Sequence, residues 1–188
     1  MPGNKARQTR AHFIENARAL ILENGIDSLS MDRLAERAGY SKGACMYHFP
    51  TKRALQRALV EDYVEHLQSQ LERHESKYAV HNERTFIQAY IDWFDDFEHY
   101  TYEWARIGVA LLSQTLNDPE VMKPLRDWYK QLYERIEDLP EDKRADTFLA
   151  IMALEGFFYT RKFGVYCEDE AVKNAALKKL RDMWTDPE

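Results

Sequence analysis

Residues 29–55 read LSMDRLAERAGYSKGACMYHFPTKRAL, and they carry the signals that predict the structure of the first part of the chain. Ser30 is a favourable N-cap for a short helix, because its hydroxyl can accept a hydrogen bond from a free amide of the first turn. Gly39 stands where a left-handed residue would end that helix, and Ser41 can cap a second helix two residues later. Two helices joined by so short a glycine-containing turn predict a helix-turn-helix.

A preceding helix is predicted over about residues 9–24 by apolar residues that recur at helical spacing, namely Phe13, Ile14, Ala17, Leu20 and Ile21. The apolar stripe of that helix can cover the inner faces of the two short helices, which gives a three-helix head. The polar residues 1–8 are expected to form a flexible arm. Its basic residues Lys5 and Arg7, with Arg10, could contact phosphates or a minor groove, or could remain a solvated tail.

The rest of the chain is also predicted to be helical. Pro50 ends the second short helix, because the residue before a proline avoids helical angles. Thr51 then caps a long helix that runs to about Lys77. Apolar stripes predict further helices over about residues 86–97, 102–116, 119–138, 141–163 and 169–184. The sequence therefore predicts an all-α chain, with the three-helix head joined by the long helix to a helical bundle.

The formal net charge of the 188 residues is −6, but the charge is unevenly distributed. Residues 1–58 hold 10 basic and 5 acidic side chains, whereas residues 59–188 hold 16 and 27. A basic head on an acidic body fits attraction of phosphate at one end only, although short segments can also differ in charge by chance.

The two cysteines, Cys45 and Cys167, have neither the number nor the spacing of a disulfide framework or a metal site. Cys45 is expected to be a small core residue; a redox-sensing thiol is the alternative. No apolar run approaches the roughly 18 residues of a membrane span, and no stretch resembles a signal peptide. We expect a cytoplasmic protein with no cofactor.

The run SKGACMYHFPTKRAL at residues 41–55 resembles the recognition helix and following helix of the TetR family of transcriptional regulators. SLSMDRLAERAGY at residues 28–40 is similar to the helix and turn that precede them, and the close match covers roughly residues 9–60. The resemblance implies a helix-turn-helix DNA-binding domain at residues 1–50 and a helical ligand-binding and dimerisation domain at residues 51–188. It also implies a homodimer that binds a double-stranded DNA operator.

The second helix of a helix-turn-helix lies in the major groove, with its N-terminal residues at the base edges. Lys42 can donate to guanine or to phosphate, and Gly43 lets the backbone come close. Ala44 and Met46 offer apolar contacts to a thymine methyl. The resemblance adds phosphate contacts by other residues. The full expected set of DNA-binding residues is Ser30, Ser41, Lys42, Gly43, Ala44, Met46, Tyr47, His48 and Lys52.

Some of these residues have alternative roles. Met46 could fill the core, and His48 could hold the corner between helices. The chain also departs from the family at two positions. Some members carry a base-reading arginine where this chain has Asp32, and several have a tyrosine where Met46 stands. The operator sequence therefore cannot be copied from relatives.

Aromatic residues make up 13% of the chain and cluster in the predicted body. Most of them could simply pack a core. By analogy with the family, a pocket between helices is expected to be lined by Trp93, Phe97, Trp104, Trp128 and Phe157. An aromatic pocket near a carboxylate would suit an organic cation or a flat aromatic compound. A neutral lipophilic or acyl ligand is equally compatible.

Asp92, Asp95, Asp96 and His99 share one face of a predicted helix at a spacing that metal ligands use. A metal would need further ligands from another helix. The same pattern is that of a solvated helix face, so no metal is predicted.

The last two predicted helices carry apolar and small residues along one side: Ala145, Leu149, Met152, Ala153 and Gly156, then Val172, Ala176, Leu180, Met183 and Trp184. Two such helices from each of two chains could pack as a four-helix bundle. The resemblance implies a homodimer through these helices, although Gly156 could equally serve an internal contact.

The predicted function is that of a ligand-responsive repressor, released from a palindromic operator when a small lipophilic or aromatic molecule binds the C-terminal domain. The ligand would act indirectly, by shifting the long helix and so the spacing of the two heads. A transcriptional activator and an architectural DNA-binding protein without a ligand are alternatives. An enzyme with an accessory head is a third, but the sequence has no nucleophile elbow, phosphate loop or HExxH motif. No catalytic residue is therefore expected.

Overall fold

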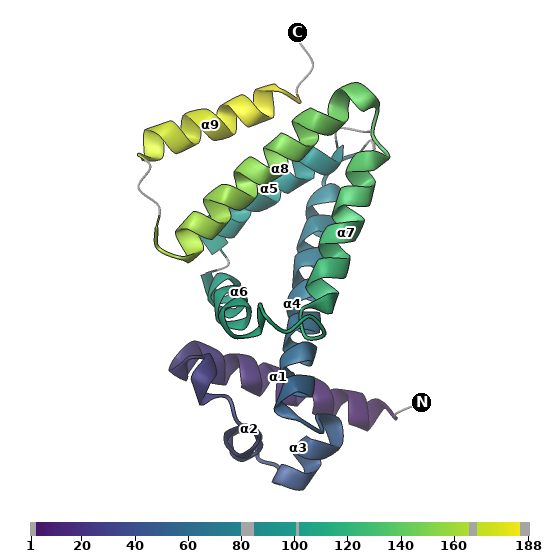
Figure 1. The fold of residues 1–188 in the computed structure, drawn as a ribbon, viewed down its shortest axis with the longest axis vertical. Coiled ribbons are helices and arrows are strands. Elements are labelled where there is room, and N and C mark those ends of the chain that lie inside the picture. Colours follow the sequence, from purple (N-terminus) through teal and green to yellow (C-terminus); the bar gives the residue numbers. More distant parts are fainter. Residues whose placement is uncertain (1–2, 80–84, 101, 166–168, 185–188) are drawn as a thin grey trace. The chain divides into compact units, whose positions relative to one another are not determined.

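A computed structural model describes residues 3–79, 85–100, 102–165 and 169–184, apart from the side chains of residues 97–100, 102, 161 and 162. The described helices are α1 Asn4–Asn24, the 3₁₀ helix η1 Ile26–Ser28, α2 Met31–Ala38, α3 Lys42–His48, α4 Lys52–Glu75, α5 Thr85–Tyr100, α6 Tyr102–Thr115, α7 Lys123–Glu137, α8 Glu141–Lys162 and α9 Glu170–Asp182 (Figure 1). Within these ranges there is no strand, and the predicted all-α class is confirmed.

The chain forms two compact units. Unit 1 comprises Met1–Glu65 and Glu103–Trp128, and unit 2 comprises His66–Tyr102 and Tyr129–Glu188. Helices α4 and α7 each contribute residues to both units. Unit 1 therefore contains the helix-turn-helix together with most of α6, which lies far from it in the sequence.

The first helix starts earlier than the sequence pattern suggested. It begins at Asn4, after Gly3 as its N-cap, so the expected flexible arm is wrong for residues 4–8. The physical reason is local: Lys5, Ala6, Arg7 and Gln8 are all good helix formers, and nothing apolar is needed to extend an established helix by one turn.

The core of the head is formed by the inner faces of α1, α2 and α3. On α1 the buried residues are those of the predicted stripe, Phe13, Ile14, Ala17, Leu20 and Ile21. They meet Leu34, Ala35 and Ala38 of α2 and Cys45 of α3, all buried, and α2 contacts both neighbours. Phe13 is fully buried, and its ring lies 6.3 Å from that of Phe49 in an edge-to-face arrangement.

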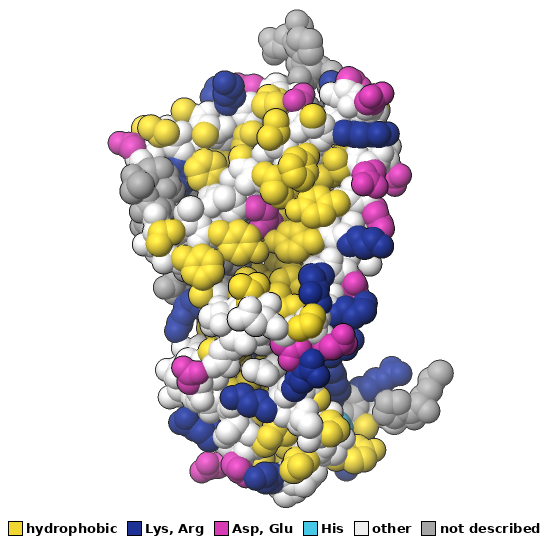
Figure 2. Space-filling model, viewed as in Figure 1, with side chains coloured by type: hydrophobic (Ala, Val, Ile, Leu, Met, Phe, Trp, Pro, Cys, Tyr) yellow, Lys and Arg dark blue, Asp and Glu magenta, His cyan; other side chains and the backbone are white. Residues whose placement is uncertain are grey.

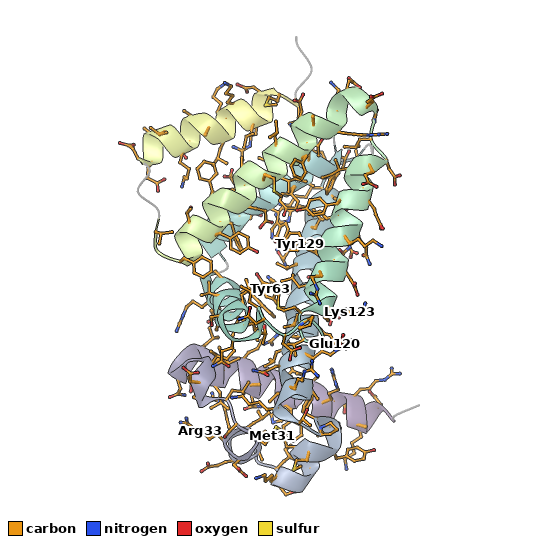
Figure 3. The ribbon with its side chains drawn as sticks, viewed as in Figure 1. Met31, Arg33, Tyr63, Glu120, Lys123 and Tyr129 are labelled. Carbon is orange, nitrogen blue, oxygen red and sulfur yellow. The ribbon has the colours of Figure 1, made fainter. Side chains whose placement is uncertain are left out.

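Polar contacts bind α6 and the turn after it to the rest of unit 1. Arg106 donates to the carbonyl oxygen of Leu22 at 2.6 Å. Arg53 makes two hydrogen bonds to Asp118, at 2.6 and 2.7 Å, and these bonds lower the pKa of the Asp118 carboxyl to about 2. Tyr63 of α4, labelled in Figure 3, has its ring centroid 6.2 Å from that of Trp104 of α6.

Unit 2 is built around α5, which contacts α8 and α9. The inward side of α8 consists of Thr147, Ala150, Ile151 and Leu154, all buried. The chain just after the C-terminal end of α9 is held to α5, because the side-chain amide of Gln88 donates to the carbonyl oxygen of Trp184 at 3.2 Å.

Candidate nucleic-acid interface and ligand-binding residues

The turn between α2 and α3 has the chemistry that the sequence predicted. The hydroxyl oxygen of Ser30 accepts a hydrogen bond from the amide of Arg33 at 3.2 Å, and that of Ser41 accepts one from Ala44 at 3.1 Å. Gly39 ends α2 in the left-handed region, at φ 72°, where residues with a Cβ are disfavoured. Because each serine accepts a bond in its cap, its hydroxyl proton remains available to an acceptor such as a phosphate oxygen.

Helix α3 presents one face to solvent and the opposite one to the core. Lys42, Gly43, Met46 and Tyr47 are exposed, with 44% exposure for Met46 and 79% for Tyr47. Met46 therefore does not fill the core. A Cβ on Gly43 would meet only the Ser41 hydroxyl oxygen, at 3.8 Å. The fold of the chain thus leaves room for a side chain there, and the open backbone is available to a partner.

Three residues of α3 are buried to different degrees. Cys45 is fully buried, as predicted for a core residue, and burial raises the pKa of its thiol. A raised pKa disfavours the reactive thiolate. His48 is half-buried, with its ring 5.7 Å from Phe13 and 5.2 Å from Tyr47. It packs in the corner between helices while keeping part of its edge in solvent. Ala44 is half-buried as well.

Lys42 is already paired in the free protein. Its ammonium nitrogen lies 2.9 Å from a carboxylate oxygen of Asp32, in the first turn of α2, and both side chains are more than half exposed. Exposed pairs of this kind contribute at most about 1 kcal/mol, so a phosphate or a guanine could replace Asp32 at small cost. Lys52, the first residue of α4, is exposed.

Arg18 joins α1 to α4 and α6. Its guanidinium makes hydrogen bonds of 2.9 and 3.2 Å to both carboxylate oxygens of Asp62 and lies 4.7 Å from the centre of the Trp104 ring. Burial raises the pKa of the Asp62 carboxyl even though Arg18 opposes this shift. A small cavity of about 90 Å³ lies beside this contact and is lined by Arg18, Leu22, Glu103, Trp104 and Ile107. It is smaller than sites for drug-sized ligands, which span roughly 300–1,000 Å³.

The five residues expected to line a ligand pocket fall in different units. Trp104 and Trp128 belong to unit 1, and Trp93 and Phe157 to unit 2. Trp93 and Trp128 are buried, whereas Phe157 is half-buried with its ring 6.1 Å from that of Phe94. The side chain of Phe97 lies outside the described residues. Their membership of one pocket remains a prediction.

Sequence reasoning missed a polar group in unit 2. Glu155 of α8 accepts hydrogen bonds from the hydroxyls of Tyr90 and Tyr129, at 2.5 and 3.0 Å. A signal was present in the sequence: Glu155 is the one charged residue in the apolar run at residues 148–159, FLAIMALEGFFY. A lone carboxylate in such a run must find partners inside the fold.

The acidic face of α5 is occupied by side chains of the protein itself. Asp92 accepts a hydrogen bond from Tyr78 at 2.7 Å, Asp96 one from His74 at 2.8 Å, and Asp95 pairs with Arg181. The side chain of His99 is not among those described. In the described part of the chain, no cluster of potential ligands could hold a metal ion.

The predicted dimer faces are largely uncovered. On α8, Ala145, Leu149, Ala153 and Gly156 are exposed and Met152 is half-buried. Val172 on α9 is exposed, and so is Met183 just beyond its end, but Trp184, which follows Met183, is only 3% exposed and packs within its own chain. The expectation that Trp184 lies on the free side of this helix is therefore wrong: it falls on the side of the buried Leu177.

Among the described residues, no helix has the length and apolarity that crossing a membrane requires.

Two family models match the chain. Residues 13–59 match the model of bacterial regulatory proteins of the tetR family, and residues 84–185 match a tetracyclin repressor-like C-terminal domain. The transcriptional repressor AcnR of Corynebacterium efficiens is 25% identical over 134 residues, which are 71% of this chain and 65% of that protein. The regulator BetI of Yersinia pestis is 22% identical over 127 residues, 68% of this chain and 64% of that protein. The matched region thus spans just under two thirds of the length of these relatives.

Solved structures show the same fold. SCO1917 from Streptomyces coelicolor A3, a member of the TetR family, superposes with a TM-score of 0.71 at 16% identity, covering 92% of this chain and 98% of that one. The multidrug binding protein EbrR complexed with ethidium superposes with a TM-score of 0.67 at 17% identity, with the same coverage.

Proposed function

The chain belongs to the tetR family of bacterial regulatory proteins, and from this membership we propose that it is a DNA-binding transcriptional repressor that leaves a palindromic operator when a small organic molecule binds its C-terminal half. The relatives named as repressors support this direction of control. An activator remains the alternative, because the sign of control depends on where the operator lies relative to a promoter.

The exposed face of α3 is the observation that carries the DNA-binding part of the proposal. The exposed residues of this helix are Lys42, Gly43, Met46 and Tyr47. On its opposite face, the buried Cys45 packs into the core of the head. In the proposed complex this face enters the major groove. The proposed contacting residues are Ser30, Ser41, Lys42, Gly43, Ala44, Met46, Tyr47, His48 and Lys52.

A homodimer through α8 and α9 would hold two heads on a symmetric operator. The uncovered side of α8 supports this proposal, since Leu149 is 62% exposed between the small residues Ala145 and Ala153. Small residues allow helices to approach closely, and half-sites about 34–36 Å apart require two heads at a fixed separation. The division into a DNA-binding domain at 1–50 and a ligand-binding and dimerisation domain at 51–188 belongs to the same proposal.

The ligand would act through α4 and α6. Because α4 contributes residues to both units, a change in the C-terminal half can be passed along it. Helix α6 is tied to the head by Arg106 and by the contact between Trp104 and Arg18. The ligand-bound structure of EbrR supports a small-molecule effector in this fold. A ligand that prefers the non-binding arrangement by a few kcal/mol would suffice.

Selection of DNA from a random pool by the purified protein tests the proposal. A palindrome enriched over bulk sequence is the expected result, and a reporter gene placed behind it should be expressed less when the protein is present. Enrichment of no sequence would leave the architectural alternative. Turnover of a bound compound would favour an enzyme, which we do not expect. We place the regulator in the cytoplasm, where bacterial DNA lies.

A further inference from the structure

Glu155 is the charged centre of an aromatic site in unit 2. It lies in the apolar part of α8 and is half-buried. A carboxylate in such a place is costly without hydrogen bonds. Tyr90 of α5 donates to Oε1 at 2.5 Å, and Tyr129 of α7 donates to Oε2 at 3.0 Å. Tyr129 projects from α7 toward α8 (Figure 3). Both carboxylate oxygens accept bonds from phenols, as an ionised Glu155 would.

A third phenol extends this network. The hydroxyl oxygens of Tyr129 and Tyr159 lie 3.3 Å apart. Because the single hydroxyl proton of Tyr129 is directed at Glu155, Tyr159 must donate to Tyr129. The bonds therefore run in one direction, from Tyr159 through Tyr129 to the carboxylate, and stabilise the ionised form of Glu155. We name Tyr90, Tyr129, Glu155 and Tyr159 the tyrosine–glutamate cluster.

Aromatic rings lead from the cluster to the surface. Tyr129 stacks on Tyr133 at 6.3 Å, and Tyr133 meets Phe148 at 6.0 Å. Tyr159 stacks on Phe163, also at 6.3 Å. Phe148 and Phe163 are 44% and 54% exposed, whereas Tyr90 is 3% exposed. Figure 2 shows hydrophobic side chains gathered over this part of α8 and toward α7, with an acidic side chain among them.

The phenols of the cluster add no charge of their own. Burial and the negative charge of Glu155 raise the pKa of Tyr90 and Tyr129 well above its ordinary value, and the pKa of Tyr133 and Tyr159 is also raised. The phenols are therefore neutral at physiological pH. Their ring faces carry partial negative charge, which attracts a cation in the same direction as the carboxylate does.

We propose that the tyrosine–glutamate cluster is the binding site for an organic cation whose charge is surrounded by alkyl or aromatic groups, such as a quaternary ammonium ion. This inference rests on the proposed effector-binding function and names the class of effector. The phenols already occupy a lone pair on each oxygen of Glu155, so the site favours a cation that binds through charge and ring contact. Phe148, Tyr133 and Phe163 supply the apolar surroundings that such a cation needs.

Calorimetry with two matched probes tests the proposal. Benzyltrimethylammonium carries the charge, and neopentylbenzene has the same shape with carbon in place of nitrogen. We expect the wild-type protein to bind the cation at least about tenfold more tightly than the neutral probe. Glu155→Gln should abolish that preference by weakening cation binding about tenfold or more. Glu134→Gln, on the exposed face of α7, is the control and should change nothing.

Equal affinity of the wild-type protein for the two probes, or binding of neither, would overturn the proposal. So would unchanged cation binding by a folded Glu155→Gln variant. If that variant loses its cooperative thermal transition, the comparison of the two probes on the wild-type protein decides alone. Operator binding is measured separately with selected DNA. If the cation binds but operator affinity does not change, the binding site is supported and the effector mechanism is contradicted. If the protein binds no operator, the calorimetric evidence for the cation site still stands.

Discussion

Lys42 and Asp32 form an ion pair across the turn of the helix-turn-helix, with 2.9 Å between the ammonium nitrogen and a carboxylate oxygen. The pair joins the first residue of α3 to the first turn of α2. It places a carboxylate on the surface that we propose to face DNA, where phosphate repels it. In the proposed complex Asp32 would therefore limit the affinity of the head for DNA of any sequence and compete with DNA for Lys42.

Replacing this carboxylate should strengthen binding to all DNA. We expect Asp32→Asn to raise the affinity for unrelated duplexes severalfold and to steepen the dependence of log K on log salt by about one, because Lys42 becomes free to pair with phosphate. Fluorescence anisotropy over a salt series measures both quantities. Glu137→Gln, exposed on α7, is the control. An unchanged salt slope in Asp32→Asn would contradict the proposed docking.

Tyr47 should contribute to DNA binding but not to folding. Its side chain is 79% exposed, so Tyr47→Ala should change the free energy of unfolding by less than about 0.5 kcal/mol. The same change should weaken binding to operator and unrelated DNA alike, about tenfold, if Tyr47 contacts phosphate. Lys42→Ala should in addition relax base preference. Full DNA affinity in a folded Tyr47→Ala protein would remove this residue from the interface.

Arg18 and Asp62 give a prediction about pH. Without the guanidinium, a charged Asp62 would be left partly buried, so Arg18→Met should destabilise the protein by about 2 kcal/mol at pH 7. Burial already raises the pKa of Asp62 in the folded state. The folded state therefore binds this proton more readily than the unfolded state, and stability falls as pH rises through the window above the ordinary pKa. The loss of stability caused by Arg18→Met should therefore be smaller near pH 5 than at pH 7. Urea unfolding of the variant and the wild type at both pH values measures it. An equal loss at the two pH values would show that the pair acts through packing alone.

The pair of His74 and Asp96 has the opposite effect on the pH dependence of stability: its contribution increases as pH rises. His74 is fully buried, with one ring nitrogen 2.7 Å from the carbonyl oxygen of Gln70 and the other 2.8 Å from Asp96. The hydrogen bond from His74 lowers the pKa of the Asp96 carboxyl. The stabilisation is thus complete above about pH 4, the ordinary range of an aspartate, and is lost as pH falls through the lowered pKa.

Asp96→Asn tests this pair. The variant should be less stable than wild type by about 1 kcal/mol at pH 7, a modest value because Asp96 is 43% exposed. The difference should narrow below pH 4, as the wild-type carboxyl becomes protonated. Urea unfolding at pH 7, 4 and 3 measures it. A difference that stays constant to pH 3 would argue against an ionic contribution.

Leu149 tests the proposed dimer. Because its side chain is 62% exposed on α8, Leu149→Glu should leave the chain folded. A buried charge at a helix-bundle interface should convert the dimer to a monomer and weaken operator binding strongly, since one head then binds one half-site. Sedimentation velocity gives the mass. Leu116→Glu, 68% exposed in unit 1, is the matched control, and a dimeric Leu149→Glu protein would exclude this face.

Local sequence signals were enough to predict the helix-turn-helix and the order of the helices. Caps, turn glycines and prolines act over a few residues, so Ser30, Gly39 and Ser41 could be assigned from their neighbours alone, and the structure confirms them. The apolar stripe of α1 also predicted its buried residues, because helical periodicity fixes which side chains share a face. The start of α1 was misjudged, since a polar helical turn has no apolar pattern to reveal it.

Contacts between residues that are distant in the sequence could be identified only from the packed fold. No local pattern indicates that Arg18 packs on Trp104, or that α6 joins the compact unit of the head. Likewise, Glu155 was readable only as a lone charge in an apolar helix, and its partners Tyr90 and Tyr129 come from two other helices. The physical reason is that helix formation depends on neighbours in the chain, whereas contacts between helices depend on the shape and polarity of whole faces, which become defined only when the helices pack.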